Sequence, residues 1–339
     1  LDEFDKIFEQ VNKLIIKITR ETLSFIKISI SEQGLKESDY DLIQGLTSNL
    51  MYLIHIIKYD YEGCFELLKD ILTLLVHILT INNKSTLNML IEKKNMINNE
   101  LKVDYPEGFV NLSLSHGISS IIMATATAYE KGIIISNQKQ AINDSLKLFM
   151  ELAYIEKVNI DNEIFTKAWW PGRMSESDFR ERKIIKEKNR ASWCYGTPGI
   201  ARVMYLASKA VGNKVCEEFA YKCLEGLTIM EVEEFMLDSP TICHGFSGVL
   251  MIADSMYKET KQERFKQLSE LMCEQIINTE DQSYDYLYYN YDYLFKGNIF
   301  PSKQKFRDLS LLEGSIGVLL TLLSYTSTND LKWKKILFI

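Results

Sequence analysis

Three residues of this chain, Cys194, Cys243 and His244, could together hold a metal ion. Zinc favours thiolate sulfur and imidazole nitrogen, and catalytic zinc sites typically use three protein ligands and leave one position open. Cys243 and His244 are adjacent, which is feasible in a turn, and Gly245 follows them directly. Cys243 lies 49 positions after Cys194, so there is no local zinc knuckle. Spacing alone therefore leaves a second interpretation open, in which both cysteines are simply packed thiols.

The positions of the histidines support the metal hypothesis. The chain has 4 histidines, and two of them, His116 and His244, stand directly before a glycine. Cys194 has nearly the same place, two residues before Gly196. If these glycine-marked loops converge in the fold, two cysteines and a histidine meet at one point.

The remaining histidines and cysteines fit a structural role. His55 and His77 lie in apolar helical runs, and we expect them to be core or boundary residues. Four cysteines also fall inside helical patterns, and free cysteine is usually a buried apolar side chain; they are Cys64, Cys216, Cys223 and Cys273. No C-x-x-C pair or secreted disulfide framework is visible.

The elements that would position the candidate ligands repeat along the chain. Each repeat has a glycine, then two residues, then glycine or serine, and it opens a run of apolar and small residues. The repeats begin at Gly45, Gly117, Gly196, Gly245 and Gly314, at intervals of 49 to 79 residues. Glycine lets the backbone turn sharply, and small residues let the following helix pack closely. We therefore expect each of these glycines to precede an inner, crowded helix.

Amphipathic stripes between these repeats predict a second set of helices. Apolar residues recur with helical spacing in residues 4–18, 141–152, 215–227 and 265–276. Residues 67–79 also predict a buried helix. Alternating inner and outer helices favour an all-α fold, an α/α toroid built as a double ring. An α-solenoid or an irregular bundle is the alternative.

Composition excludes several classes of protein. The 339 residues carry a formal net charge of −7, which argues against a nucleic-acid partner. An acidic surface would suit a basic peptide. No run reaches the roughly 20 apolar residues of a membrane span, and no signal peptide is visible. Whether an N-terminal portion is missing stays open. We expect a single domain over residues 1–339 with an irregular insertion near 157–190. We also expect loops at residues 169–172 and 284–293, which either contact peptide or lie on the surface without a binding role.

Two motifs of the chain resemble the signatures of the lanthionine synthetase C family. They are Trp193-Cys194-Tyr195-Gly196-Thr197-Pro198-Gly199 and Ile242-Cys243-His244-Gly245-Phe246-Ser247-Gly248. The repeats at Gly117 and Gly314 resemble other signatures of that family in the same order. The resemblance implies an α/α toroid with seven inner and seven outer helices, although only five glycine-marked repeats are visible here.

The resemblance also implies site residues, carried over motif by motif. Cys194, Cys243 and His244 match the zinc ligands, and one zinc ion is implied per chain. Arg190, four residues before Cys194, matches a required arginine, and Tyr195 is the motif tyrosine next to the ligand.

The remaining matches concern proton transfer. His116 matches an acid/base histidine. Asp41 matches an active-site aspartate, although Asp39 is close enough to leave the assignment open.

The implied activity is that of a zinc-dependent lanthipeptide cyclase. It would add peptide cysteine thiols to dehydroalanine or dehydrobutyrine and so form lanthionine and methyllanthionine thioether rings. The expected substrate is a dehydrated precursor with a leader peptide. A dehydratase and an exporter are expected partners, and the expected location is cytoplasmic, with peripheral membrane association left open. The alternatives are a related zinc protein that binds thiols such as glutathione without cyclising peptides, a protein prenyltransferase, and a purely structural helical protein.

Overall fold

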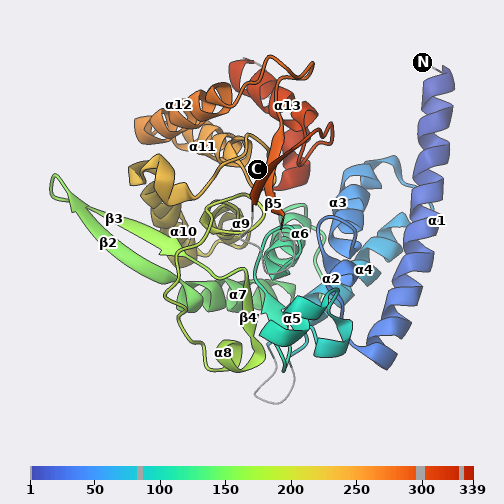
Figure 1. Ribbon diagram of the computed structural model, residues 1–339. Helices are drawn as coiled ribbons and strands as arrows, with labels where there is room; N and C mark the ends of the chain where they lie inside the picture. The colour runs from blue at the N-terminus through green and yellow to red at the C-terminus, as the bar shows by residue number, and fades with distance from the viewer. Residues whose placement is uncertain (1, 82–86, 295–301, 328–331) are drawn as a thin grey trace. The chain divides into compact units, whose positions relative to one another are not determined.

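The computed structural model describes residues 2–81, 87–294, 302–327 and 332–339, which form thirteen α-helices and three two-stranded antiparallel sheets (Figure 1). These residues divide into two compact units. The first unit comprises Leu1–Leu152, Gly172–Ile184 and Val203–Glu217, and the second comprises Ala153–Pro171, Ile185–Arg202 and Glu218–Ile339. The helices α9 (Thr197–Val211) and α10 (Lys214–Gly226) each contribute residues to both units.

The first unit is built mainly from helices. Its elements are α1 (Asp2–Gln33), α2 (Glu37–Tyr40), α3 (Leu46–Ile56), α4 (Cys64–Leu79), α5 (Asn99–Asp104), β1 (Phe109–Asn111), α6 (Ile118–Glu130), α7 (Gln138–Leu152), β4 (Arg173–Ser175) and α8 (Glu176–Arg180). The long helix α1 runs beside α3 and α4, and α4 packs on α6 and α7 (Figure 1). Strand β1 pairs with β4, with Val110 opposite Met174. The predicted buried helix at residues 67–79 is confirmed within α4.

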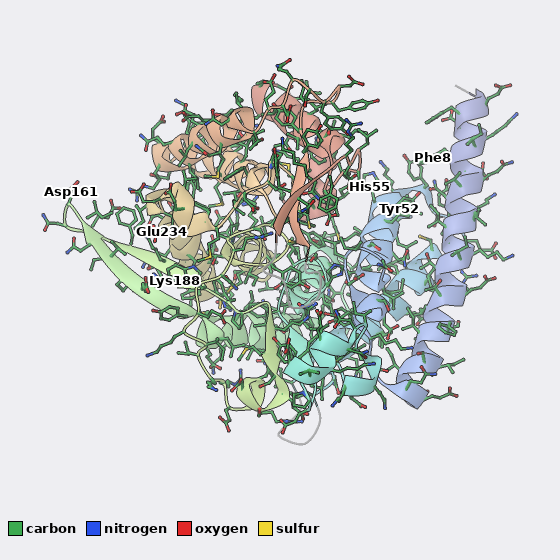
Figure 2. The ribbon with its side chains drawn as sticks, in the orientation of Figure 1. Phe8, Tyr52, His55, Asp161, Lys188 and Glu234 are labelled. Carbon is green, nitrogen blue, oxygen red and sulfur yellow. The ribbon has the colours of Figure 1, made fainter. Side chains whose placement is uncertain are left out.

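Polar and aromatic contacts attach α1 to its neighbours. The hydroxyl of Tyr52 on α3 donates to the buried Asn12 at 2.5 Å, and Asn12 donates in turn to the hydroxyl of Tyr61 at 2.9 Å. Phe8 lies edge-on to Tyr59, with 5.5 Å between ring centroids. Figure 2 labels Phe8 on α1 and Tyr52 on α3. The helix predicted for residues 4–18 is therefore confirmed within α1. Most of its predicted apolar stripe is exposed, however, and the buried positions are those of Asn12, Ile16 and Thr19; the exposed stripe residues are Phe4 (71%), Ile7 (58%), Val11 (44%), Leu14 (55%) and Ile18 (50%).

The predicted burial of His55 and His77 is wrong, because both side chains are exposed. Each lies in a helix whose apolar residues occupy the core-facing positions of the 3.6-residue period. The histidine takes an intervening, outward position. Of the four cysteines predicted to be buried, Cys64, Cys216 and Cys223 are buried and Cys273 is partly exposed.

The second unit combines helices with two hairpins. Its elements are β2 (Tyr154–Ile160), β3 (Glu163–Trp169), α11 (Phe246–Thr260), α12 (Glu263–Asn278), β5 (Asn290–Leu294), β6 (Ser302–Phe306) and α13 (Ser315–Thr326), with short 3-10 turns between them. Every residue of α11 from Phe246 to Met256 is buried, and α11 packs against both α12 and α13. The helix α11 is therefore the closely packed inner helix that the small residues after Gly245 predict. The stripe predicted at residues 265–276 is confirmed within α12.

The hairpin of β2 and β3 projects as a long arm, and Figure 2 shows Asp161 at its tip. Asp161 and Asn162 both have positive φ, at 50° and 68°, which suits a tight two-residue turn. At the other end of the arm, the Lys167 ammonium lies 2.7 Å from the Glu234 carboxylate. The hairpin and β4 with α8 occupy most of residues 157–190. The prediction of a single domain interrupted there stays a prediction.

The prediction that residues 169–172 form a loop at the surface is wrong, because the two tryptophans in this segment are buried. Trp169 ends β3 and is 1% exposed, while Trp170 is fully buried against Phe219. Two large indoles next to a strand end gain more from burial than from exposure to water. Residues 281–289 do form a loop, in which Tyr284 and Tyr288 are buried, but β5 begins at Asn290. Peptide contact by this segment stays a prediction.

The five glycine-marked repeats each precede a helix, as predicted: α3, α6, α9, α11 and α13. Close backbone contacts explain the glycines. A Cβ atom on Gly245 would lie 2.0 Å from the carbonyl oxygen of Ser239, and one on Gly314 would lie 2.4 Å from the amide nitrogen of Ser310. Gly196 has a φ of 128°, a conformation that other residues rarely adopt. Within the described ranges, no helix has both the length and the apolar character to cross a bilayer.

Candidate metal centre and acid–base pair

Three glycine-marked turns of the second unit are joined by backbone hydrogen bonds. The amide of Cys194 donates to the carbonyl oxygen of Cys243 at 3.1 Å, and the amide of Cys243 donates to the carbonyl oxygen of Leu312 at 2.9 Å. These two bonds place the turns before α9, α11 and α13 side by side. Residues far apart in sequence are thereby brought to one place by the main chain.

Ligand-type side chains meet where these turns adjoin. One atom each from Cys243, His244 and Glu313 lie within 4.8 Å of one another. The thiols of Cys194 and Cys243 are close enough for each to shift the pKa of the other, and the thiol of Cys194 lies 3.5 Å from the hydroxyl of Ser192. The structure therefore brings Cys243 together with both other predicted ligands, although among the described residues Cys194 lies outside the tighter group of three.

Glu313 is a candidate ligand that the sequence analysis missed. The signal was present, because Glu313 stands directly before Gly314, in the same position that His116 and His244 have before their glycines. Position in the repeat therefore identifies Glu313 as a candidate once the last repeat is included. Its carboxylate adds an oxygen donor to two sulfurs and one nitrogen.

The thiols of Cys194 and Cys243 have opposite pKa shifts. The hydrogen bond with Cys243 lowers the pKa of Cys194, and the hydroxyl of Ser192 and the charge of Arg190 act in the same direction. The hydrogen bond with Cys194 raises the pKa of Cys243, and burial adds to that rise. Two neighbouring thiolates would repel each other in this buried place, so one proton stays on the pair. A divalent cation would supply the missing opposite charge, and two sulfurs with one imidazole are donors that zinc prefers. The residues present thus fit a zinc ion.

Arg190 and Tyr195 lie in the same turn as Cys194. The positive charge of Arg190 lowers the pKa of both thiols, so the guanidinium acts electrostatically on the pair. The hydroxyl of Ser192 donates to the carbonyl oxygen of Tyr195 at 2.6 Å and closes the turn around Cys194. The backbone of Tyr195 therefore lies next to the candidate site.

The acid–base candidates lie in the first unit. Nδ1 of His116 is 2.6 Å from Oδ2 of Asp41. The other oxygen of Asp41 accepts the backbone amides of Gln44 and Gly45, at 2.7 and 2.8 Å. The amide of Leu42 donates to the carbonyl oxygen of Ser115 at 3.0 Å, so the two turns are again joined by the main chain.

The geometry favours Asp41 over Asp39 as the partner of His116. The carboxylate of Asp39 accepts the backbone amide of Lys36 at 2.8 Å and closes the first turn of α2. Asp39 therefore has a local, helix-capping contact. Asp41 instead joins the end of α2 to the turn before α6.

The environment of His116 favours its protonated form. The hydrogen bond to Asp41 raises the pKa of His116, whereas burial lowers it. The negative charge of Glu37 raises the same pKa, and the positive charge of Arg173 lowers it. Glu37 itself accepts a hydrogen bond from Arg173 at 3.3 Å, so these two charges partly cancel. The net effect is a raised pKa, so His116 keeps its proton to a higher pH than an ordinary histidine does.

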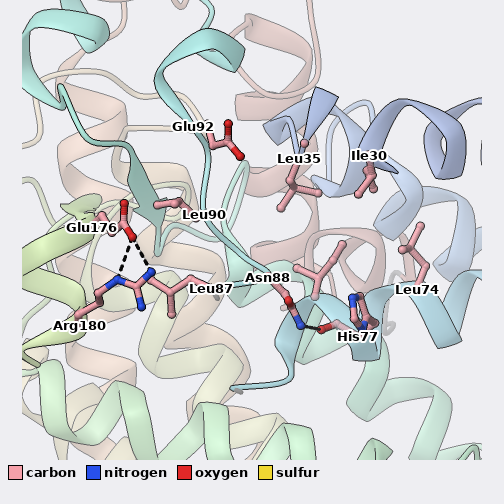
Figure 3. Close-up of a pocket in the computed structure, with 12 residues that line it drawn as sticks. Ile30, Leu35, Leu74, His77, Leu87, Asn88, Leu90, Glu92, Glu176 and Arg180 are labelled. Atoms are coloured by element: carbon pink, nitrogen blue, oxygen red, sulfur yellow. Dashed lines mark hydrogen bonds and ion pairs between the residues drawn. The ribbon is translucent and has the colours of Figure 1, made fainter. Parts of the chain in front are cut away.

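A separate pocket of about 310 Å³ lies in the first unit (Figure 3). Ile30 and Leu74 belong to its apolar lining, and the side-chain amide of Asn88 donates to the carbonyl oxygen of His77 at 2.9 Å. The ion pair of Glu176 and Arg180 also contributes to the lining. None of the predicted site residues lines this pocket, so it does not support the chemistry described above.

Comparison with known proteins identifies relatives of this chain. Residues 7–338 match the family model described as lanthionine synthetase C-like protein. The nisin biosynthesis protein NisC of Lactococcus lactis subsp. lactis is 26% identical over 282 residues, which are 82% of this chain and 62% of that protein. This chain therefore spans less than two thirds of the length of that relative.

A solved structure of nisin cyclase has the same fold. It matches with a TM-score of 0.78 at 22% sequence identity, and the match covers 100% of this chain and 75% of that chain. The prediction of an all-α fold of the α/α toroid class is confirmed by this likeness. At this identity the likeness concerns the fold and leaves the roles of the individual site residues as predictions.

Proposed function

Since this chain belongs to the lanthionine synthetase C-like family, we propose that it is a zinc-dependent cyclase that closes thioether rings in dehydrated peptides. One observation carries the proposal. Ligand atoms of Cys243, His244 and Glu313 lie within 4.8 Å of one another, and the amide of Cys194 donates to the carbonyl oxygen of Cys243 at 3.1 Å. A structural helical protein would have no need for this donor set in three adjoining turns.

Cys194, Cys243 and His244 are the proposed protein ligands of one zinc ion per chain. When bound, zinc would lower the pKa of a substrate thiol and leave its sulfur nucleophilic near neutral pH. An ordinary thiol has a pKa of about 8.5, so only a few per cent is thiolate at pH 7. The carboxylate of Glu313 is the proposed occupant of the fourth position while no thiol is bound.

The proposed reaction rearranges bonds within one peptide. The substrate sulfur forms a bond to the β-carbon of dehydroalanine or dehydrobutyrine, and the electrons of the carbon–carbon double bond move to give an enolate. A proton then adds to the α-carbon. The thiol proton that is lost and the proton that is gained balance, so the mass of the peptide is unchanged.

His116 is the proposed donor of the proton to the α-carbon. The hydrogen bond to Asp41 raises the pKa of His116 and so favours the protonated imidazole, and the same bond from Nδ1 fixes the plane of the ring. General acid catalysis of this kind contributes roughly 10²–10⁴-fold. Arg190 is proposed to stabilise negative charge, on the thiols whose pKa it lowers or on the enolate. Tyr195 is proposed to contribute from beside the ligand.

The proposed substrate is a dehydrated lanthipeptide precursor with its leader peptide. The net charge of −7 suits a basic peptide. We further propose that a dehydratase and an exporter act with this protein in a membrane-associated complex on the cytoplasmic side. The name of the relative NisC refers to nisin biosynthesis in Lactococcus lactis subsp. lactis, and nisin itself is not proposed as the substrate of this chain.

The test is to incubate the zinc-loaded protein with a dehydrated peptide that contains one cysteine. Loss of the free thiol at unchanged peptide mass, with a thioether located by fragmentation, is the expected result. A thiol that binds to the protein but is never consumed would contradict the cyclase proposal. That outcome would favour the alternative of a thiol-binding zinc protein.

A further inference from the structure

Asn290 is a buried polar residue next to the candidate metal centre. It is the first residue of β5 and is only 5% exposed, and its backbone pairs with Phe306 of β6. Two residues earlier, the carbonyl oxygen of Tyr288 accepts a hydrogen bond from Ser315 at 2.7 Å. The segment is thus held on both sides, so the amide group of Asn290 has a fixed place.

The amide oxygen of Asn290 faces two groups. Oδ1 lies 3.2 Å from Nε2 of His244 and 3.2 Å from the hydroxyl of Ser239. An amide oxygen carries no hydrogen and can only accept. The ring nitrogen Nε2 must therefore carry the proton of this contact and donate it.

A neutral imidazole has one N–H and one nitrogen with a free lone pair. With the proton of His244 on Nε2, the lone pair is on Nδ1. We propose that Asn290 is a positioning residue that fixes the Nε2–H tautomer of His244 and thereby makes Nδ1 the metal-binding atom. This inference rests on the proposed zinc site. Histidine ligands commonly donate their second N–H to an oxygen in this way, and that contact sets both the tautomer and the ring orientation.

Nuclear magnetic resonance identifies the ligating nitrogen directly. The full chain, labelled with ¹⁵N-histidine, is loaded with ¹¹³Cd²⁺ as a probe for the zinc site. With only 4 histidines, the resonances of His244 are assigned by comparison with a His244→Gln variant. We expect cadmium–nitrogen coupling at Nδ1 and an N–H at Nε2. Coupling at Nε2 overturns the inference and leaves the proposed metal site intact, whereas failure to bind cadmium counts against the metal site itself and overturns both.

Substitutions separate positioning from a general structural role. Asn290→Leu removes the acceptor at similar size, and we expect its zinc dissociation constant, measured by chelator competition, to rise about 10–100-fold. Asn290→Asp keeps an acceptor oxygen, and we expect it to bind zinc at least as tightly as the native chain. Ser239→Ala is the matched control. It removes the other hydrogen bond to the same oxygen, together with the contacts of the Ser239 hydroxyl to Thr241, without touching the ring. We expect a change of less than about threefold, well below the range for loss of the ring contact.

The outcomes are distinct. Native zinc affinity in Asn290→Leu would overturn the inference. Equal losses of affinity in Asn290→Leu and Asn290→Asp, or in Ser239→Ala and Asn290→Leu, would also overturn it, because the effect would then follow from disturbance of the loop. Thermal unfolding of each zinc-free variant, followed by circular dichroism, establishes that the compared chains are folded.

Discussion

The carboxylate of Asp41 lies 2.6 Å from Nδ1 of His116 and is almost wholly buried, with 3% of its side chain exposed, whereas 37% of the His116 side chain is exposed. A buried carboxylate therefore holds a histidine whose ring reaches toward solvent. Because the second oxygen of Asp41 is bound by two backbone amides, the carboxylate cannot turn away from the ring. The pair is thus arranged to keep one orientation of the imidazole and to favour its protonated form.

Replacing Asp41 with Asn should lower the pKa of His116. The hydrogen bond to Asp41 is the largest cause of the raised pKa. An asparagine side chain carries no negative charge, so the variant loses the charged partner of the imidazole. Asparagine retains an oxygen for the amides of Gln44 and Gly45, so the turn is preserved. The measurement is a titration of the His116 ring protons by nuclear magnetic resonance. An unchanged pKa would contradict the role given to Asp41, and Asp39→Asn, which alters the helix cap instead, should leave the pKa of His116 as it is.

The same pair predicts a pH dependence of stability. A histidine whose pKa is raised on folding adds stability that is fully present below its unfolded pKa of 6.5 and is lost as the pH rises through the folded value. Glu37 and Arg173 act on the same ring with opposite signs. The difference in unfolding free energy between the native chain and Asp41→Asn should therefore be larger at pH 6 than at pH 9. An equal difference at both pH values would show that the charged pair does not stabilise the fold.

Removing any of the three proposed zinc ligands should remove the metal and the activity together. Alanine at Cys194, Cys243 or His244 is expected to reduce the zinc content, measured by atomic emission, from about one ion per chain to near zero. His116→Ala should keep its zinc and lose ring closure by roughly 10²–10⁴-fold, or lose its stereochemical control. Normal cyclisation by a zinc-free Cys243→Ala variant would reject the mechanism.

Glu313→Gln should weaken zinc binding in the absence of thiol. The carboxylate lies within the group of ligand atoms, and its neutral analogue is a poorer donor for a cation. We expect the zinc dissociation constant to rise about tenfold, equivalent to ~1.4 kcal/mol. With a saturating small thiol the difference should disappear, because the thiol takes the position of the carboxylate. Glu270→Gln, on the exposed side of α12, is the control; equal affinities in all three chains would show that Glu313 is not a ligand.

Gly245→Ala should destabilise the chain far more than Gly132→Ala. The added Cβ at Gly245 would meet three backbone atoms, at 2.0 Å from the carbonyl oxygen and 2.7 Å from the carbonyl carbon of Ser239 and 2.7 Å from the amide of Thr241. Backbone atoms cannot move aside cheaply, so we expect a loss of more than about 3 kcal/mol of unfolding free energy. Gly132 has open space around it and a φ of 76°, so alanine there should cost only ~1–2 kcal/mol. Urea denaturation measures both, and similar losses would contradict the role of close packing at the repeat turns.

Local patterns of residues were sufficient to predict the helical elements and the places where they begin. Apolar periodicity located α1, α7, α10 and α12, and the glycine-marked repeats located the starts of five further helices. These features depend on neighbours within one or two helical turns, so local spacing is sufficient to predict them. The sequence also singled out Cys194, Cys243, His244 and His116, because chemically active residue types stood at a shared position of the repeat.

Which of these residues contact one another depends instead on tertiary packing. Hydrogen bonds between turns place Cys194 beside Cys243 and bring Glu313 to the same site, across 119 positions between Cys194 and Glu313. Asp41 is favoured over Asp39 because its carboxylate contacts His116, whereas the carboxylate of Asp39 contacts the amide of Lys36. Asn290 contacts His244 from a strand whose sequence shows no pattern typical of metal ligands. Such contacts arise from packing between segments that are distant in the chain, and spacing along the sequence does not encode which side chains meet there.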